Sequence, residues 1–214
     1  MEALLLYFVL FFPSLSGGAG ISVADIIPFS ITRELVRTFT YTIPSFALLW
    51  YLISGKNGFS ALVSEKPGSR DFIPLVFGFS GLVIIGFGIS FLVTFFSGFF
   101  GFSLPPKIAA PDNIRGWIVI FLSCFGTGYL EESYFRYYLL KKLEFQLPFP
   151  ALRIAFSTIL FAVCHFYEGP WGIINAVLAG VLLSILFIRY RSLHSIAWAH
   201  GAYNMLVYIM GNIS

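Results

Sequence analysis

Charged residues are scarce in this chain of 214 residues. Asp, Glu, Lys and Arg make up 11% of it, against about 25% in an average soluble domain. Hydrophobic residues make up 58%, and the mean hydropathy is +0.87. This balance excludes a soluble globular protein and indicates an integral membrane protein surrounded by a lipid bilayer. The net charge is only +3, and the basic residues are scattered over loops, so no nucleic-acid partner is expected.

Cysteine and histidine are scarce as well. The two cysteines, Cys124 and Cys164, both lie in apolar segments, where a free thiol behaves as a small buried hydrophobe and no disulfide framework is indicated. The chain has three histidines, and the zinc-protease signature H-E-x-x-H is missing. No repeat or low-complexity tract divides the sequence. We therefore expect one membrane domain over residues 1–214.

Long uncharged runs predict the fold. They favour an all-α, polytopic membrane helical bundle over the alternating strands of a barrel. We predict about seven transmembrane helices (six to eight), near residues 1–15, 39–53, 72–97, 116–140, 153–168, 172–188 and 194–211. The first is short for a span, so an interfacial or re-entrant segment is the alternative. Residues 21–38 are expected to form an interfacial helix or loop, and residues 55–71 a polar loop.

Lys and Arg are divided unevenly between alternate loops. The side holding loops 54–71, 141–153 and 189–193 carries most of them. Cytoplasmic loops of membrane proteins carry an excess of these residues. The count predicts that this side is cytoplasmic, with the N-terminus inside and the C-terminus outside.

Two adjacent carboxylates, Glu131 and Glu132, lie within a predicted span together with Arg136. The uncharged run before them, residues 116–130, has 15 residues, and a helix needs about 20 to cross hydrocarbon. The crossing helix must therefore include the charges, and ionisable groups at membrane depth usually mark a functional site. Glu132 and Arg136 are four residues apart and can neutralise each other, which leaves Glu131 to face another group. A purely structural ion pair explains Glu132 and Arg136 equally well.

Two histidines reach the same depth as Glu131. At a rise of about 1.5 Å per residue, Glu131, His165 and His200 lie roughly 13 to 18 Å from the basic ends of their helices. Asn204 follows His200 by one turn, on the same helix face. Three ionisable groups on three predicted helices at one depth indicate a buried site.

The same residues fall in three short motifs: EExxxR at residues 131–136, FxxxH at 161–165 and HxxxN at 200–204. In this order on membrane helices, they resemble the motifs of the CPBP intramembrane protease family. This family is also called the CAAX protease and bacteriocin-processing, or Abi, family, and is related to the Rce1-type CAAX prenyl endopeptidase. The resemblance covers residues 115–211, the expected catalytic core. Residues 1–114 match only in being hydrophobic, and we expect them to supply supporting N-terminal helices.

The resemblance implies a glutamate-type intramembrane endopeptidase that hydrolyses a peptide bond with an activated water. Glu131 would be the general base, and His165 would position the water. His200 with Asn204 would form the oxyanion hole. These roles supply what amide hydrolysis requires, namely a polarised water, a base and donors to the oxyanion.

The resemblance also bears on the ion pair and on metal. Glu132 with Arg136 would be a supporting pair that orients Glu131. Members of the family have often been labelled metalloproteases, and a catalytic zinc normally has three protein ligands. Glu131, His165 and His200 are the nominal set, but their use as ligands would leave only Glu132 as a base. We therefore favour a mechanism with no metal and no other cofactor, and zinc is the alternative.

The expected substrate is a membrane-associated protein or peptide. Eukaryotic relatives act on prenylated CAAX proteins, and bacterial relatives are linked to peptide maturation and bacteriocin self-immunity. The small size suggests a prokaryotic protein of the cytoplasmic (inner) membrane. The alternative function is a non-catalytic membrane scaffold or bacteriocin-immunity protein on the same fold. A transporter is disfavoured because the buried charges lie in one half and no repeated halves are present.

Overall fold

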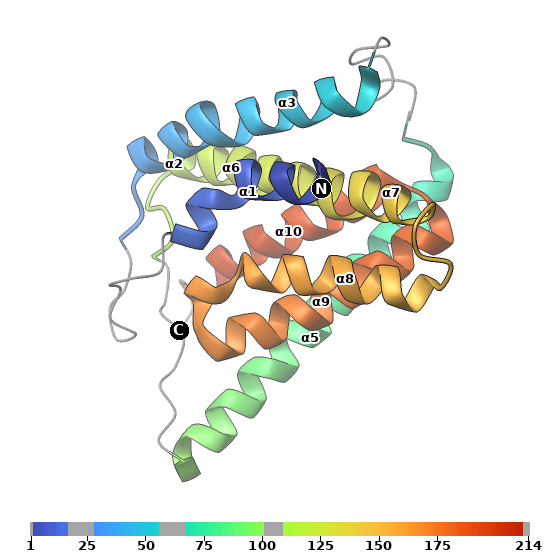
Figure 1. The fold of residues 1–214 in the computed structure, drawn as a ribbon. Helices are drawn as coiled ribbons and strands as arrows, with labels where there is room; N and C mark the ends of the chain where they lie inside the picture. Colours follow the sequence, from blue (N-terminus) through green and yellow to red (C-terminus); the bar gives the residue numbers. More distant parts are fainter. Residues whose placement is uncertain (1, 17–27, 56–66, 101–108, 212–214) are drawn as a thin grey trace.

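The computed structural model describes residues 2–16, 28–55, 67–100 and 109–211, and within these ranges the chain forms helices and no strand (Figure 1). The all-α prediction is therefore confirmed for the described residues. Two helices, Ser69–Phe96 and Phe166–Tyr190, are long and apolar enough to cross a membrane, and Glu2–Phe12 and Pro150–Val163 are shorter apolar helices. Apolar side chains such as Phe8, Phe77 and Phe91 are exposed, as a lipid-facing surface requires.

The helices follow the predicted spans closely. In chain order they are α1 (Glu2–Ser16), α2 (Ile31–Arg37), η1 (Thr38–Thr42), α3 (Ile43–Ser54), η3 (Ser69–Asp71), α5 (Phe72–Phe100), α6 (Ile114–Glu132), η4 (Ser133–Leu140), α7 (Lys141–Leu143), α8 (Pro150–Val163), η5 (Phe166–Glu168), α9 (Gly169–Tyr190) and α10 (Leu193–Gly211). Five of the seven predicted segments coincide with helices to within three residues at each end. The predicted loop 55–71 lies mostly outside the described residues.

Two predicted boundaries were wrong. The helix expected over 153–168 ends at Val163, because the backbone N–H and the imidazole of His165 bond back to the carbonyls of Ala162 and Phe161 and close the last turn. His165 therefore lies in the turn between α8 and α9. Residues 31–38, expected to be interfacial, begin a helix that continues without a break into α3, and Ser30 caps it by accepting from the backbone N–H of Arg33 at 3.3 Å.

The helix that runs from α6 to α7 changes its winding in the middle. It is π-helical over η4, directly after Glu132. Two side chains from neighbouring helices contact this segment: Ser157 donates to the Phe135 carbonyl at 2.9 Å, and the Trp50 indole donates to the Ser133 hydroxyl at 3.1 Å. Such π segments are rare and occur often at functional sites.

Helices α6 and α10 pack backbone against backbone. A Cβ atom added at Gly128 would lie 2.8 Å from the Ala197 carbonyl oxygen, and one added at Gly201 would lie 3.0 Å from Cα of Phe125. Glycine is required at both positions because any side chain would force the helices apart. This contact brings the end of α6 beside the middle of α10.

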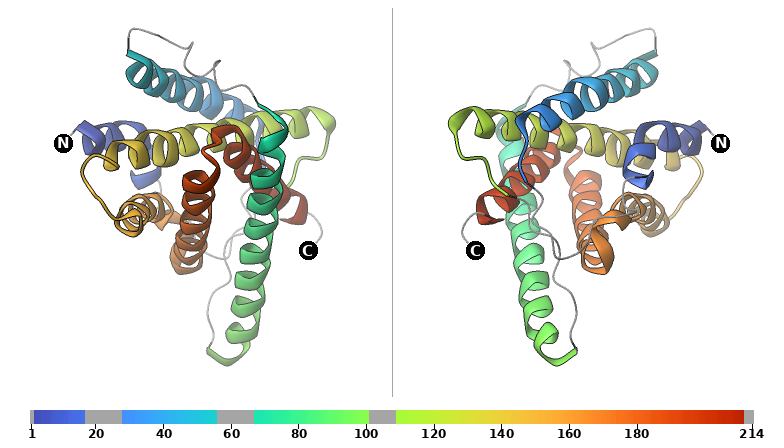
Figure 2. Two further views of the ribbon diagram at one scale, coloured as in Figure 1. Left: turned by 90° about the vertical axis from the view of Figure 1, so that its right-hand side faces the viewer. Right: turned by 90° about the vertical axis from the view of Figure 1, so that its left-hand side faces the viewer.

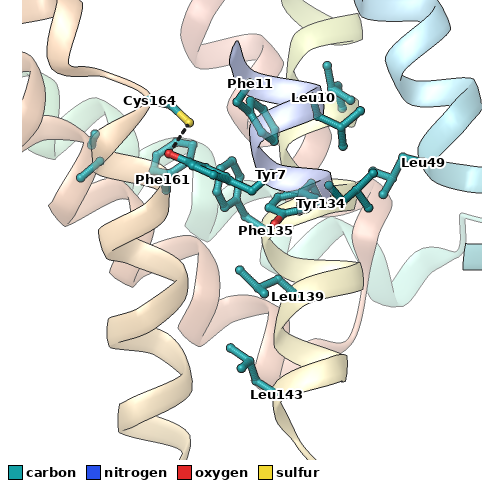
Figure 3. Packing of buried hydrophobic residues seen from close by; sticks show 14 residues of the cluster. Tyr7, Leu10, Phe11, Leu49, Tyr134, Phe135, Leu139, Leu143, Phe161 and Cys164 are labelled. Carbon is teal, nitrogen blue, oxygen red and sulfur yellow. Dashed lines mark hydrogen bonds between the residues drawn. The ribbon is translucent and has the colours of Figure 1, made fainter. Parts of the chain in front are cut away.

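The N-terminal helix α1 lies beside the α6–α7 helix and above α8 (Figure 1), and its inner face is buried. It runs antiparallel to η4, since Glu2 at its start pairs with Lys142 at 2.6 Å and the Phe11 ring near its end lies 4.9 Å from the Phe135 ring. The Tyr134 hydroxyl also donates to the Ala3 carbonyl at 2.7 Å. Figure 3 shows the resulting core, in which residues of α1 pack on η4 and α8. The short first segment is thus an integral part of the bundle.

Charged side chains gather where α7, α8 and α9 meet. Glu144 pairs with Arg153 at 3.3 Å and with Arg191 at 2.5 Å, which ties the α7–α8 loop to the end of α9. This is the end predicted to be cytoplasmic. Figure 2 shows that α5 extends past its neighbours at its far end.

Candidate active site

Three buried side chains form the centre of the site. Glu132 and Arg136 are both fully buried, and Arg136 Nη1 donates to Glu132 Oε1 at 2.9 Å. His200 of α10 donates from Nδ1 to the same oxygen at 2.8 Å. The ion pair predicted from the i,i+4 spacing is confirmed, and the structure adds His200 as a third member.

Arg136 is held by more than its carboxylate. Its Nη2 donates to the Gly180 carbonyl of α9 at 3.4 Å, and its guanidinium carbon lies 4.5 Å from the centroid of the Phe161 ring. A cation packed on an aromatic face gains electrostatic energy, and the gain increases when both are shielded from water. Arg136 thereby links α6, α8 and α9 around the site.

Glu131 is placed differently from its neighbour. Its Oε2 atom is buried and has no hydrogen-bond partner among the described residues, and it lies 3.7 Å from His200 Nε2. Glu132 Oε2 is likewise buried without a hydrogen-bond partner among the described residues, but Glu132 Oε1 accepts from both Arg136 and His200, so Glu132 is the carboxylate whose charge is compensated. The two adjacent carboxylates are therefore chemically distinct.

His165 has a defined tautomer. Its Nδ1 lies 2.8 Å from the Phe161 carbonyl, which can only accept, so Nδ1 carries the proton and Nε2 keeps its lone pair. The residue is half-buried and has φ −103° and ψ 12°, in the sparsely populated bridge region where many active-site residues lie. Its ring is set to accept a hydrogen bond at Nε2.

The Phe161 ring connects the histidines. Its centroid lies 4.6 Å from that of His165 and 6.0 Å from that of His200. Phe161 packs at the point where His165, His200 and Arg136 approach one another. The FxxxH motif identified this position, but the sequence did not predict which residues its ring contacts.

Two asparagines lie on the helices that carry His200 and Gly180. Asn204 follows His200 by one turn of α10 and is half-buried. Asn175 of α9, which no motif supports, is also half-buried, and its Oδ1 has no hydrogen-bond partner among the described residues. The sequence could not predict that the Gly180 carbonyl accepts a hydrogen bond from Arg136, because every residue has a backbone carbonyl.

The residues do not assemble a metal site. Across the described ranges, no three His, Cys, Asp or Glu side chains are grouped as a metal ion would require. The nominal zinc ligands Glu131, His165 and His200 are part of the site but do not form such a group.

Together, the fold and the site define a helical membrane protein with two carboxylates, an arginine and two histidines inside its bundle. Residues 113–206 match the family described as type II CAAX prenyl endopeptidase Rce1-like. This region carries all of the site residues described above. The family consists of membrane-embedded peptide hydrolases, so the resemblance drawn from the three motifs is confirmed. No curated protein and no solved structure matches the chain.

Proposed function

We propose that this protein is an intramembrane endopeptidase that cleaves membrane-associated proteins or peptides with a glutamate-activated water. The observation that carries the proposal is the difference between the two glutamates. Each has one buried oxygen without a hydrogen-bond partner among the described residues. Glu132 is neutralised by Arg136 at 2.9 Å, whereas the buried Oε2 of Glu131 faces His200 Nε2 at 3.7 Å. A general base needs this combination of burial and a free acceptor atom.

In the attacking step, Glu131 takes a proton from a water molecule whose oxygen adds to the scissile carbonyl carbon. His165 accepts a hydrogen bond from the same water at Nε2, since its Nδ1 proton is held by the Phe161 carbonyl. Two acceptors from different elements orient the lone pair of the water toward the substrate. Such positioning contributes much of the rate in hydrolytic enzymes.

The negative charge that develops on the carbonyl oxygen requires donors. His200 uses Nδ1 to donate to Glu132, so it can donate from Nε2 only as an imidazolium. In that form the charges of Glu131, Glu132, Arg136 and His200 sum to zero. Asn204, one turn further along α10, supplies the second donor from its side-chain amide.

The tetrahedral intermediate then collapses. The C–N bond breaks, and the protonated Glu131 returns its proton to the leaving nitrogen, which gives a free amine and a new carboxylic acid. The same residue thus acts as base and then as acid. No other reactant than water is consumed.

The family description motivates the choice of the first substrate. We propose a farnesylated CaaX peptide as the probe, and a protein anchored in a prokaryotic cytoplasmic membrane as the class of natural substrate. Cleavage of the aliphatic tripeptide from such a probe would occur at the membrane surface or within it, where the prenyl chain is anchored.

The test uses the purified protein in liposomes with a quenched fluorescent farnesylated peptide, together with a comparison of membrane-protein termini in cells. Glu131→Gln should lower cleavage by at least about 100-fold, because general-base catalysis contributes about that much. Glu144→Gln is the matched control, since it makes the same change in a carboxylate at the charged end of the bundle, and it should retain activity. Full activity of Glu131→Gln would exclude the glutamate mechanism. If the peptide stays uncleaved, and the termini of cellular membrane proteins are the same with and without the intact protein, the scaffold or immunity role is favoured.

A further inference from the structure

The side chain of Tyr7, on the N-terminal helix α1, reaches the turn that carries His165. Tyr7 is 2% exposed. Its hydroxyl donates to the Leu160 carbonyl at 3.0 Å and accepts from the Cys164 thiol at 3.3 Å. Figure 3 shows the tyrosine extending from α1 to the cysteine at the end of α8. The contact joins residues more than 150 positions apart in the sequence.

The end of α8 is held by two side chains. The last carbonyls of a helix lack intrahelical partners and need other donors. At this end, the Phe161 carbonyl accepts from His165 Nδ1 at 2.8 Å and the Ala162 carbonyl accepts from the His165 backbone N–H at 3.0 Å. The Leu160 carbonyl accepts from the Cys164 backbone N–H at a long 3.4 Å and, more closely, from the Tyr7 hydroxyl at 3.0 Å. Tyr7 and the proposed water-binding histidine therefore stabilise consecutive carbonyls of one turn.

A second path of contacts connects the same residues. The Tyr7 ring lies 6.3 Å from that of Phe135, Phe135 lies 5.1 Å from Phe161, and Phe161 lies 4.6 Å from His165, all between ring centroids. Aromatic rings in such edge and tilted arrangements restrict one another. The position of His165 therefore depends on α1 through hydrogen bonds and through packing.

We propose that Tyr7 is a positioning residue for His165. Its hydroxyl fixes the Leu160 carbonyl and the Cys164 thiol, so the next carbonyl, that of Phe161, stays where it accepts the Nδ1 proton. This selects the tautomer whose Nε2 lone pair receives the water. The role in catalysis rests on the proposed function, and it extends the active site to the N-terminal helix, outside the region that matches the family.

The hydroxyl can be separated from the ring. Tyr7→Phe keeps the aromatic packing and removes only the two hydrogen bonds. Tyr134→Phe is the matched control, because the Tyr134 hydroxyl also bonds α1 to the bundle, through the Ala3 carbonyl at 2.7 Å, but does not contact the His165 turn. A loss that comes merely from loosening α1 should appear in both variants.

Activity is measured in liposomes with the farnesylated peptide. Tyr7→Phe should lower kcat by about 3- to 10-fold with KM unchanged, the loss expected for one hydrogen bond that acts on the chemical step. Tyr134→Phe should keep kcat while lowering the thermal midpoint to a similar extent. Equal kcat losses in the two variants, or a change confined to KM, would overturn the positioning role.

A second readout needs no turnover. In protein labelled with ¹⁵N-histidine, the His165 signals, assigned by their loss in His165→Gln, should report the Nδ1–H tautomer. Tyr7→Phe should give a mixture of tautomers, and Tyr134→Phe should not. An unchanged tautomer in Tyr7→Phe would refute the proposal even if no substrate is cleaved. Failure of the proposed function would instead appear as no difference between the unmodified protein and Glu131→Gln.

Discussion

At the scale of single residues, the burial of Arg136 determines what the site tolerates. Its guanidinium is fully buried and is compensated by Glu132, the Gly180 carbonyl and the Phe161 ring. Removing one member of a buried ion pair leaves the other charge without compensation and costs about 3 to 5 kcal/mol, whereas replacing both members with apolar or neutral groups is often neutral. Stability and catalysis can therefore be separated at this pair.

We expect Arg136→Met to lower the free energy of unfolding by about 3 to 5 kcal/mol, because Glu132 remains as a buried charge. The double variant Glu132→Gln with Arg136→Met should recover most of this loss but stay inactive, since Glu131 and His200 lose their orienting partner. Thermal unfolding in detergent and peptide cleavage measure the two effects.

The control for this prediction is Arg191→Met. Arg191 is about half exposed in its pair with Glu144, and exposed pairs contribute about 1 kcal/mol or less. An Arg136→Met protein as stable as this control would show that the buried pair does not stabilise the fold.

At the scale of helices, the close contact between α6 and α10 positions His200 beside the two glutamates. The contact depends on Gly128 and Gly201, whose missing side chains let the backbones approach. Small residues at such interfaces are a common means of packing helices in membranes. The distance from His200 Nε2 to Glu131 Oε2 is therefore set by backbone packing as much as by the side chains.

Gly128→Ala should lower cleavage by about 10- to 100-fold, because its Cβ would lie 2.8 Å from the Ala197 carbonyl and displacements of about 1 Å at a catalytic site have such effects. Gly88→Ala on α5 is the control, since nothing lies within 4 Å of its added Cβ. That variant should keep activity and gain up to about 1 kcal/mol of helix stability. Equal activity of the two variants would argue against a packing-controlled site.

Helices were predictable because their signal is local. Uncharged runs gave the positions of five segments, and the i,i+4 spacing gave the pair of Glu132 with Arg136. The π-helical segment was not predictable, since it is contacted from other helices, for example by Ser157 on the Phe135 carbonyl. The early end of α8 was not predictable because the hydrogen bond from the His165 imidazole to the Phe161 carbonyl depends on how that side chain is oriented. Nothing in the sequence near those positions specifies their partners.

At the scale of the whole molecule, the charged end and the lipid-facing surface define an orientation. Glu144, Arg153 and Arg191 meet at the end where α7, α8 and α9 converge. The excess of Lys and Arg on this side predicts that it faces the cytoplasm. Helix α6 begins at the opposite end of the molecule, directly after Asp112 and Asn113, which are exposed.

This orientation can be tested by labelling single cysteines in intact cells. In a protein without Cys124 and Cys164, a membrane-impermeant maleimide should label Asp112→Cys directly and Gln146→Cys only after lysis. Both positions are exposed, so accessibility to the reagent depends on the side of the membrane. The reverse pattern would show that the charged end faces outward.

The site as a whole was predicted in part. Depth and motifs selected Glu131, His165, His200 and Asn204. In the structure, Glu131 lies beside His200, and the Phe161 ring packs against both His165 and His200. The roles of these residues stay predictions until activity is measured. The sequence missed the involvement of α1, because a tyrosine in an apolar helix is indistinguishable from an interfacial anchor until its partner is known.

The π-helical winding of η4 has a consequence for chain length. A π turn contains one more residue than an α turn, so the segment after Leu140 is rotated relative to a regular continuation of α6. Regular α winding of the present number of residues would turn the charged end by about 100°, which would move Lys142 away from Glu2 while Glu131 stayed in place. Deleting one residue together with a return to regular winding would instead leave this end near its present orientation. The length of this helix and its π winding therefore depend on each other, and a one-residue gap within residues 133–140 should be accompanied by regular winding.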